Sequence, residues 1–199
     1  APPVSTRAAM VALLGRSTER LARLGQHIAA EAAAAAAVDE VVADEQALRA
    51  LCRAILAAIG SSAEEQEIVA DHLVEAMLKG HDSHGVQMLS GYIISNESGL
   101  LHPNSKVKVV GRSGPLLTVD SGGFENGGFG MVAAREATLL AVETAKKEGV
   151  ALLMLRNCHH IGRVGTYAEI AASHGIITTL YTNVCDPLTL LAHALLSLP

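Results

Sequence analysis

A short polar motif, Gly-His-Asp-Ser-His-Gly at residues 80–85, contains side chains that could transfer a proton. Histidine has an unperturbed pKa near neutrality, and a neighbouring serine can fix which ring nitrogen carries the proton. Ser83 and His84 therefore form a candidate proton-transfer pair. The flanking glycines allow a sharp turn and a close approach of a ligand. The motif alone fits an ordinary polar turn after a helix equally well, so both interpretations are open at this point.

A second polar stretch, Arg-Asn-Cys-His-His-Ile-Gly-Arg-Val-Gly-Thr-Tyr at residues 156–167, follows an apolar run. Polar residues between a strand and a helix lie where free helix N–H groups can hold anionic ligand groups, so this is a second candidate site. Its cysteine and histidines, with those of residues 80–85, raise the question of zinc. Adjacent ligands rarely point at one ion, and the spacing matches no known zinc pattern, so no metal site is predicted.

Two amphipathic helices precede the first motif. Apolar residues at three-and-four spacing predict a helix over 44–60, and a capping box at 62–65 begins a second helix that ends at residue 80. Their tight connection predicts a helical hairpin. His72 lies beside the apolar stripe and is interpreted as a partly buried packing residue, and Cys52 as small core filler.

The remainder of the sequence has the pattern of an α/β segment. Short extended runs at 107–110 and 116–119, separated by Gly, Ser and Pro, predict a β-hairpin. An amphipathic helix is predicted over about 131–148, followed by a buried strand over 150–155. A further apolar run predicts another strand over 176–184.

Residues 128–133 formally match the Gly-x-Gly-x-x-Ala fingerprint of a dinucleotide fold. That fingerprint requires its first glycine directly after a strand, whereas about eight residues separate Asp120 from Gly128. The next strand also ends in Arg156 and Asn157 rather than in an acidic residue that would hold a ribose. We therefore interpret this stretch as a loop that caps a helix.

The composition restricts the class of protein. The chain has 199 residues, of which 50% are hydrophobic, enough for one good core or two small subdomains. With no Trp, two Phe, three Tyr and a net charge of −5, it lacks the stacking surfaces and basic field of a nucleic-acid-binding protein. The three cysteines have no Cys-x-x-Cys spacing, and no apolar run reaches the length of a membrane span. These features predict a cytoplasmic protein that binds neither nucleic acid nor membrane.

Residues 1–43 differ in character from the rest. They are rich in alanine and carry arginine at positions 7, 16, 20 and 23. Alanine favours helix, and an arginine-rich start is typical of organelle transit peptides. A solvated helical arm and a targeting segment are both open interpretations of this extension.

Together these motifs resemble the malate/L-lactate dehydrogenase family of type 2, and most closely its hydroxycarboxylate dehydrogenase branch. The resemblance runs in order from about residue 45 to about residue 184. It rests on residues 68–73, 80–85, 99–104, 119–120, 129–130 and 159–163.

The resemblance implies an α/β fold, with an N-terminal helical segment and an incomplete NAD(P)-binding α/β domain that is not a Rossmann fold. In these terms residues 44–105 are the helical part of the substrate and catalytic domain, and 106–184 are a partial NAD(P)-binding domain. Residues 1–43 are the extension, and 185–199 are a divergent apolar tail.

The resemblance also implies an oxidoreductase that uses NAD or NADP to interconvert 2-hydroxy and 2-oxo carboxylates, in a homodimer whose site lies between domains. In this family's pattern His84 resembles the general acid/base and Ser83 its orienting partner. His160 resembles the second site histidine. The segment that lines the cofactor comprises His160, Ile161, Gly162, Arg163 and Val164. Hydride transfer to a carbonyl leaves an alkoxide, and an imidazolium held by a serine can protonate it at neutral pH.

Two departures from the family pattern stand out. Met88 occupies the position where many members carry an arginine that clamps the substrate carboxylate, although the branch most resembled often has methionine there. After Val184 the family continues through further cofactor-domain sequence, whereas this chain runs into an apolar tail and stops. We therefore expect a chain truncated at its C-terminus, whose own activity is open. A catalytically dead module that pairs with a complete subunit is an alternative, and a metal-dependent hydrolase is a further one.

Overall fold

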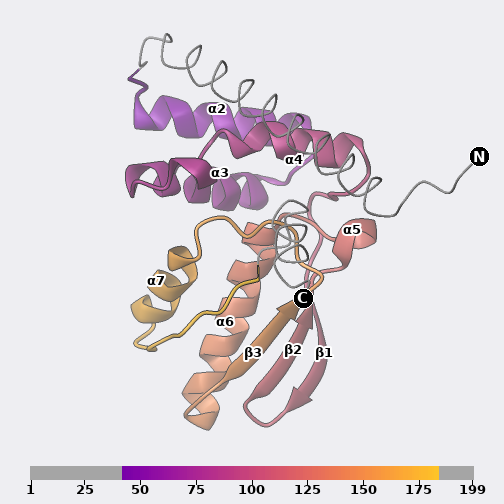
Figure 1. Ribbon diagram of the computed structural model, residues 1–199, viewed down its shortest axis with the longest axis vertical. Coiled ribbons are helices and arrows are strands. Elements are labelled where there is room, and N and C mark those ends of the chain that lie inside the picture. The colour runs from indigo at the N-terminus through magenta and orange to yellow at the C-terminus, as the bar shows by residue number, and fades with distance from the viewer. Residues whose placement is uncertain (1–41, 184–199) are drawn as a thin grey trace, which may run out of the picture. The chain divides into compact units, whose positions relative to one another are not determined.

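The computed structural model describes residues 42–183, and from Asp44 onward these belong to one compact unit. The interpretations of the N-terminal extension and of the apolar tail fall on residues 1–41 and 184–199, outside the described part. The chain has the mixed α/β architecture that the sequence predicts, with a helical layer and a three-stranded sheet (Figure 1). The division into domains at residues 105 and 184 stays a prediction.

The predicted helical hairpin is confirmed as α2 (Glu45–Ala58) and α3 (Ala63–Leu78). Asp44 caps α2 by accepting a hydrogen bond from the backbone N–H of Ala47 at 2.9 Å. Ser62 caps α3 in the same way, with its hydroxyl oxygen 3.3 Å from the N–H of Glu65. Both caps satisfy N–H groups that an isolated helix end would leave unpaired.

The capping box predicted at residues 62–65 forms only in part, and the predicted contact from Glu65 is wrong. The Glu65 carboxylate does not return to the N–H of Ser62; it accepts hydrogen bonds from the hydroxyl of Ser61 at 2.8 Å and the backbone N–H of Asn104 at 2.9 Å. The N–H of Ser62 instead donates to the side-chain oxygen of Asn104 at 2.7 Å. Because Glu65 is buried, the segment at Asn104 is the partner that satisfies its carboxylate, and α3 is thereby joined to the start of the sheet region.

After α3 the chain forms a short 3-10 helix, η1 (Asp82–His84), and then α4 (Met88–Glu97). The helix α4 was not foreseen from the sequence. Its buried residues, Leu89 and Tyr92, join a core shared with α2, α3 and the first turn of α6 (Gly130–Glu148). The helical layer and the beginning of α6 are therefore held by one set of apolar contacts.

The predicted hairpin is confirmed, and so is a strand near 150–155. Its expected burial is wrong for the described residues, because Leu152 and Met154 are exposed. Strand β1 (Lys108–Ser113) pairs antiparallel with β2 (Leu116–Asp120), and β2 pairs parallel with β3 (Leu152–Arg156). The connection from β2 to β3 passes through the short α5 (Gly123–Asn126) and through α6, which lies along the sheet (Figure 1). Because β2 and β3 are parallel, the loops that follow them begin at the same edge of the sheet.

The expected strand over 176–184 is wrong for the residues described. Helix α7 (Gly165–Ser173) is followed by residues 176–183, none of which is in a strand. The apolar composition of this run suggested burial, but Ile177 and Tyr181 are almost fully exposed. A strand needs a hydrogen-bonded neighbour, and in residues 42–183 β2 is the only strand paired with β3.

Gly130 is a point of close packing between α6 and the segment after β3. A Cβ atom at this position would lie 2.1 Å from the carbonyl oxygen of His159 and 2.4 Å from that of His160. Gly128 is similarly placed, since its Cβ would lie 2.9 Å from the carbonyl oxygen of His102. Both glycines of the formal dinucleotide fingerprint thus serve contacts within the chain, which supports the interpretation of this stretch as a helix-capping loop.

We predict opposite effects for two Gly→Ala changes in helices. Gly130→Ala should lower the free energy of unfolding by about 1–3 kcal/mol, because the backbone of residues 159 and 160 would have to move. Gly91→Ala in α4 should raise it by roughly 0.5–1 kcal/mol, because its Cβ would meet nothing within 4 Å and alanine favours helix. Urea unfolding of both variants measures this, and equal effects would contradict the packing argument.

Candidate active site

The first polar motif forms a tight turn at the end of α3. Gly80 has a φ of 75°, which favours glycine, and it lets the chain leave the helix. Gly85 lies against the helix, since a Cβ there would be 2.3 Å from Cγ of Met77. The turn brings the Ser83 hydroxyl within 2.9 Å of Nδ1 of His84, and the imidazole is half-buried. One ring nitrogen of His84 is thus engaged, and Nε2 is the nitrogen available to exchange a proton.

The structure brings the second polar motif to the first. The rings of His84 and His160 are stacked, with centroids 5.4 Å apart and an interplanar angle of 27°. Nδ1 of His160 lies 2.8 Å from the phenol oxygen of Tyr92, which comes from α4. Sequence reasoning missed Tyr92, because nothing in the local pattern of α4 indicates a partner so far along the chain. The candidate site therefore contains two imidazoles, a serine hydroxyl and a buried phenol.

Burial sets the protonation states around His160. It lowers the pKa of His160, and nearby His84 and His159 lower it further, because a second positive charge beside them is unfavourable. Burial also lowers the pKa of His159 and raises that of the Tyr92 phenol. At neutral pH His160 is therefore a neutral imidazole and Tyr92 keeps its proton.

The rest of the segment predicted to line a cofactor is fixed by contacts within the chain. The carbonyl of Ile161 accepts a hydrogen bond from the phenol of Tyr167, and Gly162 has a φ of 67°. The side chain of Arg163 is buried and paired with Glu169, so its charge is already neutralised. Val164 is half-buried and directly precedes α7. Of this segment, the ring of His160 is the group that contacts His84.

His72 does more than its interpretation as a partly buried packing residue implies. It is buried, and its Nε2 accepts a hydrogen bond from the backbone N–H of Arg163 at 2.8 Å. Burial lowers its pKa from 6.5 to about 4, the charges of Arg163, His160 and His84 act in the same direction, and Glu169 opposes them. His72 is thus a neutral acceptor that joins α3 to the segment after β3.

Asp120 holds together the loops at the carboxyl ends of β2 and β3, where ligands of open α/β sheets commonly bind. Its carboxylate accepts hydrogen bonds from the N–H of Gly122 at 2.8 Å, from Nε of Arg156 at 2.8 Å and from the side-chain amide of Asn157 at 2.9 Å. These contacts hold the pKa of Asp120 below its usual value, with the Gly122 N–H as the main cause. The sequence showed the three polar residues but not that one carboxylate joins them.

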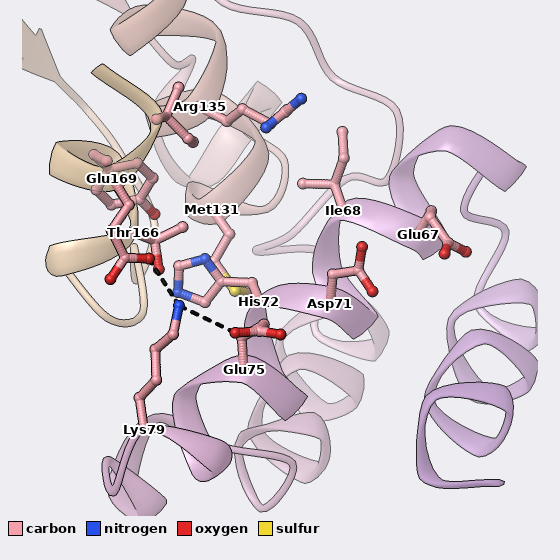
Figure 2. A pocket seen from close by; sticks show the side chains of 12 residues that line it. Glu67, Ile68, Asp71, His72, Glu75, Lys79, Met131, Arg135, Thr166 and Glu169 are labelled. Atoms are coloured by element: carbon pink, nitrogen blue, oxygen red, sulfur yellow. Dashed lines mark hydrogen bonds and ion pairs between the residues drawn. The ribbon is translucent and has the colours of Figure 1, made fainter. Parts of the chain in front are cut away.

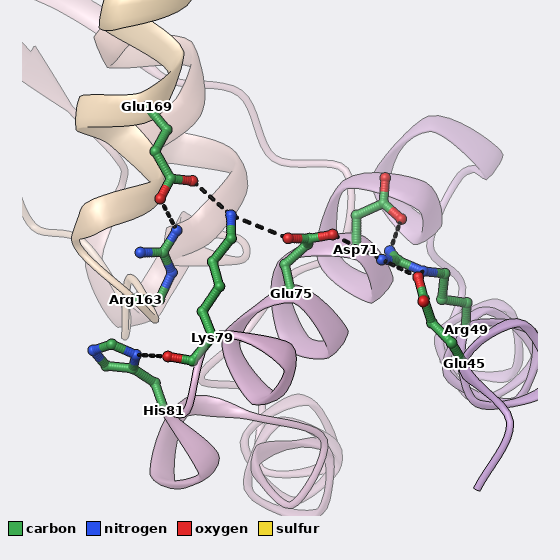
Figure 3. Close-up of polar contacts among 8 residues, drawn as sticks. All are labelled: Glu45, Arg49, Asp71, Glu75, Lys79, His81, Arg163 and Glu169. Carbon is green, nitrogen blue, oxygen red and sulfur yellow. Dashed lines mark hydrogen bonds and ion pairs between the residues drawn. The ribbon is translucent and has the colours of Figure 1, made fainter.

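A separate groove of about 350 Å³ lies between α3, α6 and α7, with His72 among its lining residues (Figure 2). Four of its charged side chains belong to a chain of ion pairs, namely Asp71, Glu75, Lys79 and Glu169 (Figure 3). Lys79 joins Glu75 at 3.1 Å to Glu169 at 2.8 Å, and Glu169 pairs in turn with Arg163. None of Ser83, His84 and His160 lines this groove. The acidic side chains that line the groove all pair with neighbouring cations.

Between residues 42 and 183, no helix is both long and apolar enough to cross a membrane. In the same part of the chain, no group of three or more His, Cys, Asp or Glu side chains is arranged to hold a metal ion.

The sequence and the fold of this chain match those of one family of known proteins. Residues 43–194 match the family described as malate/L-lactate dehydrogenase. Hydroxycarboxylate dehydrogenase B of Escherichia coli K12 is 40% identical over 141 residues, covering 71% of this chain and 38% of that protein. The malate dehydrogenase of Pyrococcus abyssi is 38% identical over 129 residues, covering 65% and 34%.

Solved structures agree with these relatives. The structure of malate dehydrogenase from Pyrococcus horikoshii matches with a TM-score of 0.63 and 33% identity, covering 69% of this chain and 39% of that one. The chain belongs to the malate/L-lactate dehydrogenase family. It spans only 34–39% of the length of the three proteins compared.

We predict that His72 makes stability depend on pH. Between pH 6.5 and about 4 the unfolded chain binds a proton at this residue that the folded chain does not. The free energy of unfolding should therefore fall as the pH falls through this window, by on the order of 3 kcal/mol in full, and level off below it. His72→Gln keeps an acceptor for the Arg163 N–H and removes the titration. Urea unfolding from pH 7 to pH 4 should show a shallower slope in the variant, and equal slopes would refute the assignment.

Proposed function

We propose that this chain carries the acid/base half of an NAD- or NADP-dependent dehydrogenase that interconverts 2-hydroxy and 2-oxo carboxylates. The observation that carries the proposal is the stacking of His84 on His160 at 5.4 Å, with Ser83 bonded to Nδ1 of His84. Membership of the malate/L-lactate dehydrogenase family supports it, as do relatives named for the oxidation of malate and other hydroxycarboxylates.

In the direction of reduction, His84 protonates the substrate oxygen through Nε2. The carbonyl carbon of the 2-oxo acid gains hydride and its oxygen becomes an alkoxide, which must take up a proton. The hydroxyl of Ser83 holds the other nitrogen of the ring, so that Nε2 keeps its direction during the transfer. In the direction of oxidation His84 takes the same proton back, and its half-buried position lets it exchange that proton with solvent.

The nicotinamide cofactor supplies or accepts the hydride when it is bound. We propose that residues 160–164 line its site, with the neutral ring of His160 as the contact nearest to His84. A neutral imidazole fits this position, because it offers a hydrogen bond without placing a second positive charge beside His84. The guanidinium of Arg163 is paired with Glu169, so we do not assign it to a ribose phosphate.

The substrate carboxylate needs a partner other than residue 88. Met88 is half-buried and packs against the helical core, and a thioether cannot form a charge-assisted pair. The proposal also keeps, as predictions from the resemblance, a homodimer with the site between domains and a cytoplasmic location. No observation in residues 42–183 favours a catalytically dead module or a metal-dependent hydrolase.

We predict that His84→Ala lowers kcat for 2-oxo acid reduction by roughly 10²–10⁴-fold, because the alkoxide loses its proton donor. Consumption of reduced nicotinamide, followed by absorbance with a panel of 2-oxo acids, measures this in the protein that contains the chain. His81→Ala is the matched control: His81 is exposed, and its ring nitrogen bonds the carbonyl of Lys79. Its kcat should stay within about 2-fold of the parent, because it performs no proton transfer. Turnover of no 2-oxo acid, or an unchanged rate in His84→Ala, would end the proposal.

A further inference from the structure

We propose that Tyr92 is the positioning residue of the candidate site: its phenol fixes His160 as the tautomer that carries its proton on Nε2. The proposal deepens the function proposed above, because it assigns the state of the imidazole that stacks on His84. It rests on the geometry around His160, which no local sequence pattern predicts.

The phenol of Tyr92 is held firmly in place. Tyr92 is 2% exposed and belongs to the core that joins α4 to α2, α3 and the start of α6. Its ring meets the ring of Phe129 edge to face, with centroids 5.5 Å apart and an interplanar angle of 85°. Aromatic pairs favour this geometry, and Phe129 directly precedes α6. The phenol oxygen is therefore held in one position, within hydrogen-bond distance of Nδ1 of His160.

The direction of this hydrogen bond follows from what each atom can do. Within residues 42–183 the phenol has no hydrogen bond other than the one to Nδ1 of His160. If Nδ1 carried a proton, it would donate to the phenol oxygen and leave the buried O–H of Tyr92 unpaired, which is unfavourable. If the phenol donates instead, both groups are satisfied. Nδ1 is then the acceptor, and the proton of the neutral ring is on Nε2.

The charges around His160 support the same state. Burial lowers its pKa, and so do His84 and His159, so the ring is neutral at pH 7. Burial raises the pKa of Tyr92, so the phenol keeps the proton that it donates. In this proposal the two histidines have different roles. His160 presents an N–H of fixed position, while His84 carries the proton that is transferred.

Nitrogen NMR of the full chain, labelled with ¹⁵N-histidine at pH 7, tests the proposal directly. His160, assigned by the loss of its signals in His160→Gln, should show a neutral ring protonated on Nε2 alone. Tyr92→Phe keeps the aromatic ring and removes the O–H, so the two nitrogen signals of His160 should move toward each other as the tautomers mix. In the protein that contains the chain, kcat of Tyr92→Phe should fall by less than that of His84→Ala.

Tyr167→Phe is the matched control. Tyr167 is also 2% exposed, and its phenol donates to the carbonyl of Ile161, next to His160 in the chain. Its ring contacts His72 rather than His160. The change should therefore leave the tautomer of His160 as it is in the parent chain.

Protonation on Nδ1 in the parent chain, or an unchanged spectrum in Tyr92→Phe, would overturn the proposal. The parent spectrum decides by itself if Tyr92→Phe does not fold. The result is also independent of the proposed function. A fixed tautomer that Tyr92→Phe releases, without turnover of any 2-oxo acid, would leave the positioning role standing and remove the dehydrogenase assignment.

Discussion

The hydrogen bond from the backbone N–H of Arg163 to Nε2 of His72 is the contact on which the site depends. It spans 2.8 Å between a helix of the helical layer and the segment that follows β3. Gly162 makes it possible, because a Cβ at that position would lie 2.2 Å from the same nitrogen. Only a neutral imidazole can accept this hydrogen bond. Burial keeps His72 neutral, and the neutral ring in turn holds the segment at Arg163 in place.

Gly130 fixes the other side of the same segment. Helix α6 begins against the carbonyl oxygens of His159 and His160, at a distance that no side chain would permit. With α3 on one side and α6 on the other, the backbone at residue 160 has little freedom. The ring of His160 can then be set by a single further contact, the phenol of Tyr92, and it stacks on the ring of His84.

Sequence patterns predicted those features that depend on contacts between residues close together in the chain. The helix caps at Asp44 and Ser62, the hairpin of β1 and β2, and the Ser83–His84 contact all involve residues a few positions apart. The resemblance to a family added the prediction that His84 and His160 are both site histidines. The partners of Glu65, His72 and Tyr92 lie 39, 91 and 68 residues away, and no periodicity or spacing reports a contact across such a separation. The prediction of a strand over 176–184 is wrong for the same reason. An apolar run does not show whether another strand lies beside it to form hydrogen bonds.

The proposed chemistry needs groups that transfer a proton and a sheet that holds the cofactor. The described residues contain the first more completely than the second. Ser83, His84, Tyr92 and His160 already contact one another within residues 42–183. The sheet is less complete: Leu152 and Met154 on its outer face are 68% and 63% exposed, and in the described part β3 is paired on one edge alone. Open edges and apolar faces of this kind are normally covered. The proton-transfer groups are therefore positioned by contacts within these residues, whereas the outer face and the free edge of the sheet are open in the described part.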